Sequence, residues 1–145
     1  MALGMHVKTA KGRVLLIDDD AEVRRIVHLA LTKDGYDVVE ATDGAEAIEA
    51  IRTGDNPLLT DVIICDVRMP QVNGIEAVAF FREQFPSVPI IVLTGYPDMN
   101  LATSFLKQGV IEYLVKPIEK EKLIATVNAM QHRSEKIHEN LQYVV

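Results

Sequence analysis

Five short apolar runs, rich in β-branched residues, set the strongest limit on how this chain can fold. They lie at 14–17, 38–39, 62–65, 90–93 and 113–115. Three of the runs are continuously apolar, which is typical of strands covered on both faces of a parallel sheet. Segments with helical spacing separate them, such as the stripe of Val23, Ile26, Val27, Ala30 and Leu31. Because strand and helix alternate along the chain, we predict an open α/β fold with right-handed crossovers.

Turn residues agree with this division into strands and helices. Gly35, Gly54 and Gly109 each follow a helical pattern, where a left-handed helix cap is expected. Asp43 followed by Glu46 predicts a capping box at the start of the second helix.

Composition and charge exclude several classes of protein. The 145 residues are 48% hydrophobic and 25% charged, which is ordinary for a globular domain. No apolar stretch is long enough for a membrane span, and the net charge of −6 disfavours direct binding to nucleic acid. The single cysteine, Cys65, lies in an apolar run and cannot form an internal disulfide. We therefore expect a reduced, cytoplasmic protein in which Cys65 is a small buried hydrophobe. The four histidines, His28 among them, have no carboxylate-rich or ligand-spaced neighbours in the sequence, and we interpret them as surface residues.

Polar side chains follow four of the five apolar runs at the point where each run ends. They are Asp18, Asp19 and Asp20 after the first run, Asp66 after the third, Thr94 after the fourth, and Lys116 after the fifth. The carboxyl ends of parallel strands meet at one edge of a sheet, where ligands bind. Of these residues, we interpret Asp20 as the N-cap of the first helix.

The chemistry of this set points to phosphoryl transfer. Neighbouring carboxylates repel one another unless a cation lies between them, and oxygen ligands favour a hard ion such as Mg²⁺. Lys116 and Thr94 are suitable partners for phosphoryl oxygens, and a carboxylate beside them can act as a nucleophile toward phosphorus. The residues thus predict a Mg²⁺-dependent phosphoryl-acceptor site.

The segments at 16–25, 65–70, 93–95 and 113–117, together with Gly74, follow the order of the signatures of a known family. Over roughly 13–131 the chain resembles the response-regulator receiver domains of two-component signalling. The resemblance implies a doubly wound, flavodoxin-like fold: a five-stranded parallel sheet, strand order 2-1-3-4-5, flanked by five helices. The resemblance places a receiver domain at 13–131, and we expect a disordered or vector-derived segment at 1–12 and a helical extension at 132–145.

The resemblance assigns roles to the acidic residues. Asp66 matches the phosphoacceptor of the family. Asp19 matches the carboxylate that binds Mg²⁺ (or Mn²⁺) directly, and Asp18 matches its acidic neighbour, which acts largely through water. Arg68 matches the position whose backbone carbonyl also binds the metal.

Three further residues match the family's switch machinery. Lys116 matches the lysine that pairs with the phosphoryl group, and its bond to Pro117 resembles one that the family holds in cis. Thr94 matches the hydroxyl that moves toward the phosphate, with a strand-end turn residue as the simpler interpretation. Tyr113 matches the aromatic residue that swings inward, with a half-buried strand aromatic as the alternative.

The implied function is a phosphorylation-controlled switch and not a metabolic enzyme, since the family catalyses only its own phosphorylation and dephosphorylation. The phosphodonor would be a sensor histidine kinase, a phosphotransfer protein or a small phosphodonor. The change would be transmitted through the face formed by the fourth helix, the fifth strand and the fifth helix. A homodimer could form through this face or through the C-terminal helix.

Three other functions remain open at this point. In a haloacid-dehalogenase-type phosphatase, Asp18 and Asp20 would form the Asp-x-Asp pair, but Glu22 replaces the expected Thr or Val and a cap segment has no room. A flavodoxin-like nucleotide or flavin carrier would place three aspartates where they repel a phosphate. A receiver-like module that is never phosphorylated usually lacks the acceptor or the lysine, and Asp66 and Lys116 are both present.

The last part of the chain carries a heptad-like pattern. Its positions are Val127, Met130, Ser134, Ile137, Leu141 and Val144, of which only Ser134 is polar. The simpler interpretation is that 123–130 packs the last helix on the sheet. Because the pattern continues beyond 131, we expect a signalling helix or short coiled coil that leads to a partner or to an output module.

Overall fold

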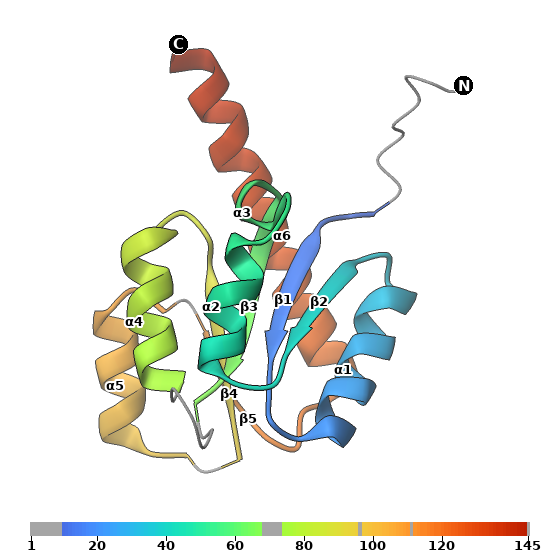
Figure 1. Ribbon diagram of the computed structural model, residues 1–145, viewed down its shortest axis with the longest axis vertical. Helices are drawn as coiled ribbons and strands as arrows, with labels where there is room; N and C mark the ends of the chain where they lie inside the picture. Colours follow the sequence, from blue (N-terminus) through green and yellow to red (C-terminus); the bar gives the residue numbers. More distant parts are fainter. Residues whose placement is uncertain (1–9, 68–73, 96, 111, 145) are drawn as a thin grey trace.

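A five-stranded parallel sheet with helices on both faces forms the body of the molecule (Figure 1). The computed structural model describes residues 10–67, 74–95, 97–110 and 112–144, and of 133–144 it describes only the helical backbone. The strands are β1 (Arg13–Ile17), β2 (Asp37–Ala41), β3 (Thr60–Asp66), β4 (Ile90–Thr94) and β5 (Glu112–Val115). Their order is β2-β1-β3-β4-β5, and every pair is parallel. The predicted fold class and strand order are confirmed.

Two hydrophobic layers, one on each face of the sheet, explain why three runs are continuously apolar. Alternate residues of β1 point to opposite faces, so that Leu15 belongs to one layer and Leu16 to the other. The first layer packs against α2 (Gly44–Arg52), α4 (Gly74–Gln84) and α5 (Met99–Lys107). The second packs against α1 (Ala21–Lys33) and α6 (Lys120–Val144). The edge strands β2 and β5 are more exposed, and their runs are correspondingly shorter.

The described residues include a sixth helix that the sequence did not predict. It is the single turn α3, Asn56–Leu59, with Pro57 in its first turn, where proline is tolerated. Arg13 holds the start of this turn, since its Nη1 donates to Asp55 Oδ1 at 2.6 Å and to Asn56 Oδ1 at 2.9 Å. The expectation of five helices was wrong because these contacts join residues far apart in the sequence.

The predicted helix caps are confirmed. Gly35, Gly54 and Gly109 have φ values of 100°, 58° and 94°, which residues with a side chain rarely adopt. Asp20 is the N-cap of α1, where its carboxylate accepts from the amides of Glu22 and Val23. This role engages the Asp20 carboxylate with the first turn of α1.

Helix α6 continues without a break to Val144, and Figure 1 shows its C-terminal part extending beyond the sheet. Leu123 and Val127 are buried in the second layer, and Met130 packs against it. The predicted packing of 123–130 is therefore confirmed. The boundaries of the receiver domain and the role of 132–145 as a signalling helix stay predictions.

Cys65 lies in β3 and is fully buried, as expected. Burial raises the pKa of its thiol, so the side chain stays neutral and behaves as a small hydrophobe. Among the helices of the described residues, none combines the length and the apolar character that crossing a membrane requires.

Candidate functional site

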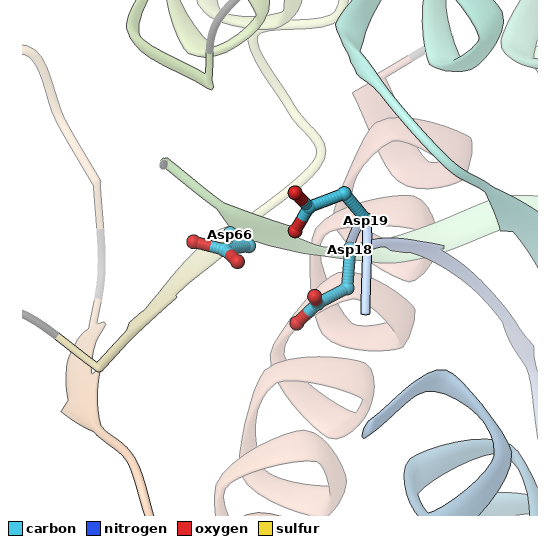
Figure 2. A group of neighbouring side chains, drawn as sticks. All are labelled: Asp18, Asp19 and Asp66. Carbon is cyan, nitrogen blue, oxygen red and sulfur yellow. The ribbon is translucent and has the colours of Figure 1, made fainter. Parts of the chain in front are cut away.

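Three aspartates meet at the carboxyl edge of the sheet because of the way β1 and β3 pair. Ile17 lies opposite Cys65 in this pair, so the next residues, Asp18 and Asp66, lie side by side at the strand ends. Each of Asp18, Asp19 and Asp66 offers a carboxylate oxygen, and these oxygens lie within 4.8 Å of one another. Figure 2 shows Asp18 and Asp19 reaching toward the side on which Asp66 lies. Asp18 and Asp66 are buried, whereas Asp19 is exposed.

Lys116 reaches this group from the end of β5. Its Nζ donates to Asp18 Oδ2 at 2.7 Å and to Asp66 Oδ2 at 3.1 Å, and its backbone amide donates to the carbonyl of Thr94 at 2.7 Å. The following peptide bond, to Pro117, is cis, as the resemblance implied. The structure thus brings together four of the predicted site residues, from three strands.

The charges of the site are unbalanced. Burial raises the pKa of Asp18, although hydrogen bonds from Lys116 and from the Asp20 amide oppose this rise. Burial by itself would lower the pKa of Lys116, but its hydrogen bond to Asp18 and the charges of Asp18 and Asp66 raise it overall. Among the described residues, the Lys116 ammonium contacts two of three neighbouring carboxylates, an arrangement that a further cation stabilises.

The donor set fits a hard divalent cation. Carboxylate oxygens from Asp18, Asp19 and Asp66 are ligands that Mg²⁺ and Mn²⁺ accept, and one of the three carboxylates is exposed, which leaves the site accessible to a hydrated ion. Arg68, whose carbonyl was predicted as a further ligand, lies outside the described residues.

Thr94 and Tyr113 lie on the two strands next to this group. Thr94 ends β4 and is buried. Tyr113 is half-buried in β5 and packs against the first hydrophobic layer, and its hydroxyl accepts from the amide of Asp98 at 3.3 Å. Asp98 is the N-cap of α5, so this contact joins the tyrosine to the start of that helix. The simpler interpretation of Tyr113, a half-buried strand aromatic, describes its position.

Sequence reasoning missed a basic residue beside the site. The Nη1 of Arg24 donates to the main-chain oxygen of Asp18 at 2.7 Å, and its Nε donates to Glu40 Oε1 at 3.0 Å. His28 has a carboxylate partner that its neighbours in the sequence did not indicate, since its Nδ1 lies 2.6 Å from Glu40 Oε2. Arg24 and His28 are four residues apart on α1 and so share a helix face, but the position of Glu40 on β2 depends on the tertiary fold.

Similar proteins agree with this geometry. The family model described as "Response regulator receiver domain" matches residues 14–128. The transcriptional regulatory protein ZraR of Klebsiella oxytoca is 33% identical over 120 residues, which are 82% of this chain and 26% of ZraR. The DNA-binding transcriptional regulator NtrC of Proteus hauseri is 30% identical over 131 residues, which are 90% of this chain and 27% of NtrC. The chain thus spans about a quarter of the length of these relatives.

Solved structures show the same fold. A response regulator receiver domain protein from Clostridium thermocellum has a TM-score of 0.81 and 28% identity, covering 87% of this chain and 98% of that chain. The chemotaxis protein CheY4 of Vibrio cholerae has a TM-score of 0.74 and 33% identity, covering 82% of this chain and 98% of that chain. By its sequence, its strand order and the residues at its strand ends, the chain belongs to the response regulator receiver domain family of two-component systems.

Proposed function

We propose that the domain is a phosphorylation-controlled switch that accepts a phosphoryl group on Asp66. The observation that carries the proposal is the contact of Lys116 Nζ with both Asp66 and Asp18, at the point where Asp19 completes a group of three carboxylates. A buried carboxylate next to an ammonium and a cation site has what nucleophilic attack on phosphorus needs. The donor would be a sensor histidine kinase, a phosphotransfer protein or a small phosphodonor, and the domain would act in the cytoplasm.

In the proposed reaction, a carboxylate oxygen of Asp66 forms a bond to phosphorus while the bond from phosphorus to the donor's nitrogen or oxygen breaks. The product is an aspartyl phosphate. Lys116, 3.1 Å from Asp66, is placed to pair with an oxygen of the transferred group. Asp18, Asp19, Asp66 and the predicted Arg68 carbonyl would hold Mg²⁺ or Mn²⁺, which supplies positive charge to the phosphoryl oxygens when bound.

The change would then pass to the face formed by α5, β5 and α6. These are the predicted fourth helix, fifth strand and fifth helix, since α3 raises the numbering by one. The Thr94 hydroxyl would move toward the phosphoryl group, and Tyr113 would give up its hydrogen bond to the Asp98 amide and turn inward. For this domain we propose protein partners only. The DNA binding named for NtrC is a property of that relative.

The haloacid-dehalogenase alternative finds less support. It requires the carboxylates of Asp18 and Asp20 to act together, but Asp20 accepts hydrogen bonds from two amides of α1. The carboxylates grouped with Asp18 are those of Asp19 and Asp66, and Asp20 is not among them.

Intact mass measured after incubation with Mg²⁺ and acetyl phosphate tests the proposal. We expect the gain of one phosphoryl group, which EDTA prevents and hydroxylamine removes, because acyl phosphates react with hydroxylamine. No gain at any Mg²⁺ concentration would contradict the proposal and favour a module that works without phosphorylation.

Magnesium is expected to stabilise the protein through Asp19. At 100 times its dissociation constant, Mg²⁺ should raise the free energy of unfolding by about 2.7 kcal/mol. Asp19→Asn should weaken binding at least about tenfold, which reduces the stabilisation at the same Mg²⁺ concentration to about 1.4 kcal/mol or less.

Asp20→Asn is the matched control for this measurement by urea unfolding. It removes the same charge one residue further on, and asparagine is an equally good N-cap. An equal Mg²⁺ response in Asp19→Asn and Asp20→Asn would show that Asp19 is not a ligand.

We further propose that a second copy binds through the α5–β5–α6 face or through the C-terminal part of α6. Replacing Ile137 and Leu141 by glutamate should abolish self-association through the tail, because charges at the core positions of a coiled coil are strongly unfavourable. Analytical ultracentrifugation checks this. Self-association of equal strength in the double variant would exclude the tail as the interface.

A further inference from the structure

Arg24 joins the acidic loop after β1 to the neighbouring strand β2. Its guanidinium donates to the Asp18 carbonyl oxygen at 2.7 Å and to Glu40 Oε1 at 3.0 Å, and only 16% of its side chain is exposed. A guanidinium presents its donors in a rigid planar fork, so the two contacts fix its orientation.

Glu40 is itself held from two sides. While Oε1 accepts from Arg24, Oε2 lies 2.6 Å from Nδ1 of His28, one turn further along α1. The carboxylate therefore cannot turn without losing one of these contacts. The carboxylate of Glu40 is therefore a fixed hydrogen-bond acceptor for the Arg24 side chain.

The atom that Arg24 contacts belongs to the peptide group between Asp18 and Asp19. The Asp18 amide donates to the Ala41 carbonyl at 3.2 Å, and Asp18 Oδ1 accepts from the Asp20 amide at 2.9 Å. The main chain of Asp18 is thus hydrogen-bonded at both its amide, to β2, and its carbonyl, to Arg24 of α1. A rotation of the peptide group that follows would move the exposed carboxylate of Asp19 relative to Asp18 and Asp66.

We propose that Arg24, anchored by Glu40, is a positioning residue for the carboxylates of Asp18 and Asp19. It acts through the orientation of their shared peptide group and does not touch the cation or the phosphoryl group. This inference rests on the proposed function, because it takes the three aspartates to be the ligands of a divalent cation.

Calorimetric titration of the full chain with Mn²⁺ tests the inference. Arg24→Gln should raise the dissociation constant by about tenfold, as is usual when a residue that orients metal ligands is lost. Arg24→Lys should restore part of the affinity, because an ammonium can reach one of the two acceptors but not both. Glu40→Gln weakens the support of Arg24 but keeps the guanidinium and its donors, so it should give a smaller loss than Arg24→Gln.

Arg25→Gln is the matched control for charge. Arg25 is the next residue of α1 and carries the same charge as Arg24. It pairs with Glu22 on the surface, where 67% of the Arg25 side chain is exposed. Because water and salt screen such a charge, its removal should change the dissociation constant by no more than about twofold.

A second measurement does not depend on metal. In ¹⁵N-labelled, metal-free protein, Arg24→Gln should shift the amide resonance of Asp19, which follows the contacted carbonyl, while Arg25→Gln should leave it in place. Equal Mn²⁺ affinities and equal Asp19 shifts in the two variants would overturn the inference and leave the proposed function standing. A wild-type protein that binds no Mn²⁺ would overturn both.

Discussion

Replacing Asp66 by asparagine is expected to abolish the gain of phosphoryl mass from acetyl phosphate and Mg²⁺. The carboxamide is not a nucleophile at neutral pH, and loss of the attacking group in enzymes that use one lowers rates by about a thousandfold or more. The substitution keeps the size of a buried side chain and one hydrogen-bond acceptor for Lys116. The fold should therefore be retained, which circular dichroism checks alongside intact mass.

Asp61→Asn is the control from the same strand. Asp61 lies at the opposite end of β3, where its Oδ2 accepts from the Arg13 amide at 3.0 Å, a bond that asparagine can also accept. This variant should gain one phosphoryl group at the wild-type rate. An equal gain in Asp66→Asn would mean that another residue is the nucleophile.

Removing the Lys116 ammonium is expected to affect both phosphorylation and stability. Lys116→Met should lower the rate of phosphoryl gain by about a hundredfold, the usual cost of losing one charge-stabilising group at a reacting centre. In the absence of metal it should also lower the free energy of unfolding by about 3 kcal/mol, because it removes the ammonium that pairs with the fully buried carboxylate of Asp18. Urea unfolding in EDTA measures the second effect.

The loss of stability in Lys116→Met should depend on pH in a definite direction. Burial raises the pKa of Asp18 even with the lysine present, so removal of the lysine raises it further. Between the ordinary aspartate pKa of about 3.9 and the raised pKa of Asp18, the folded variant binds more protons than its unfolded chain. Its free energy of unfolding therefore falls as the pH rises through this range. The deficit relative to the wild type should therefore shrink as the pH is lowered from neutrality toward 4.

Lys120→Met is the control, because Lys120 is an exposed residue at the start of α6. It should show wild-type phosphorylation and no pH-dependent deficit. A deficit of Lys116→Met that stayed constant with pH would show that lost packing, and not the unpaired carboxylate, causes it.

The strands and the chemistry of the strand ends could be predicted from sequence because both are local signals. Buried parallel strands require continuous apolar runs, and β1, β3 and β4 have them. A parallel sheet brings the carboxyl ends of its strands to one edge, so the positions of Asp18, Asp66 and Lys116 after their runs were enough to predict that they meet. The strand order came from the resemblance to a family, since periodicity carries no information about which strands are neighbours.

Contacts between distant residues were decided by the tertiary structure alone. Helix α3 has no apolar periodicity of its own and is held by Arg13, 42 or more positions earlier in the chain. The pairing of Arg24 and His28 with Glu40 depends on how α1 lies against β2. The same holds for the pKa of Asp18, which is raised by burial, and burial depends on what packs around the strand ends. The sequence by itself determined which residues meet at the edge of the sheet, and only the folded structure decided how they are held there and how their charges are balanced, because packing sets both distance and desolvation.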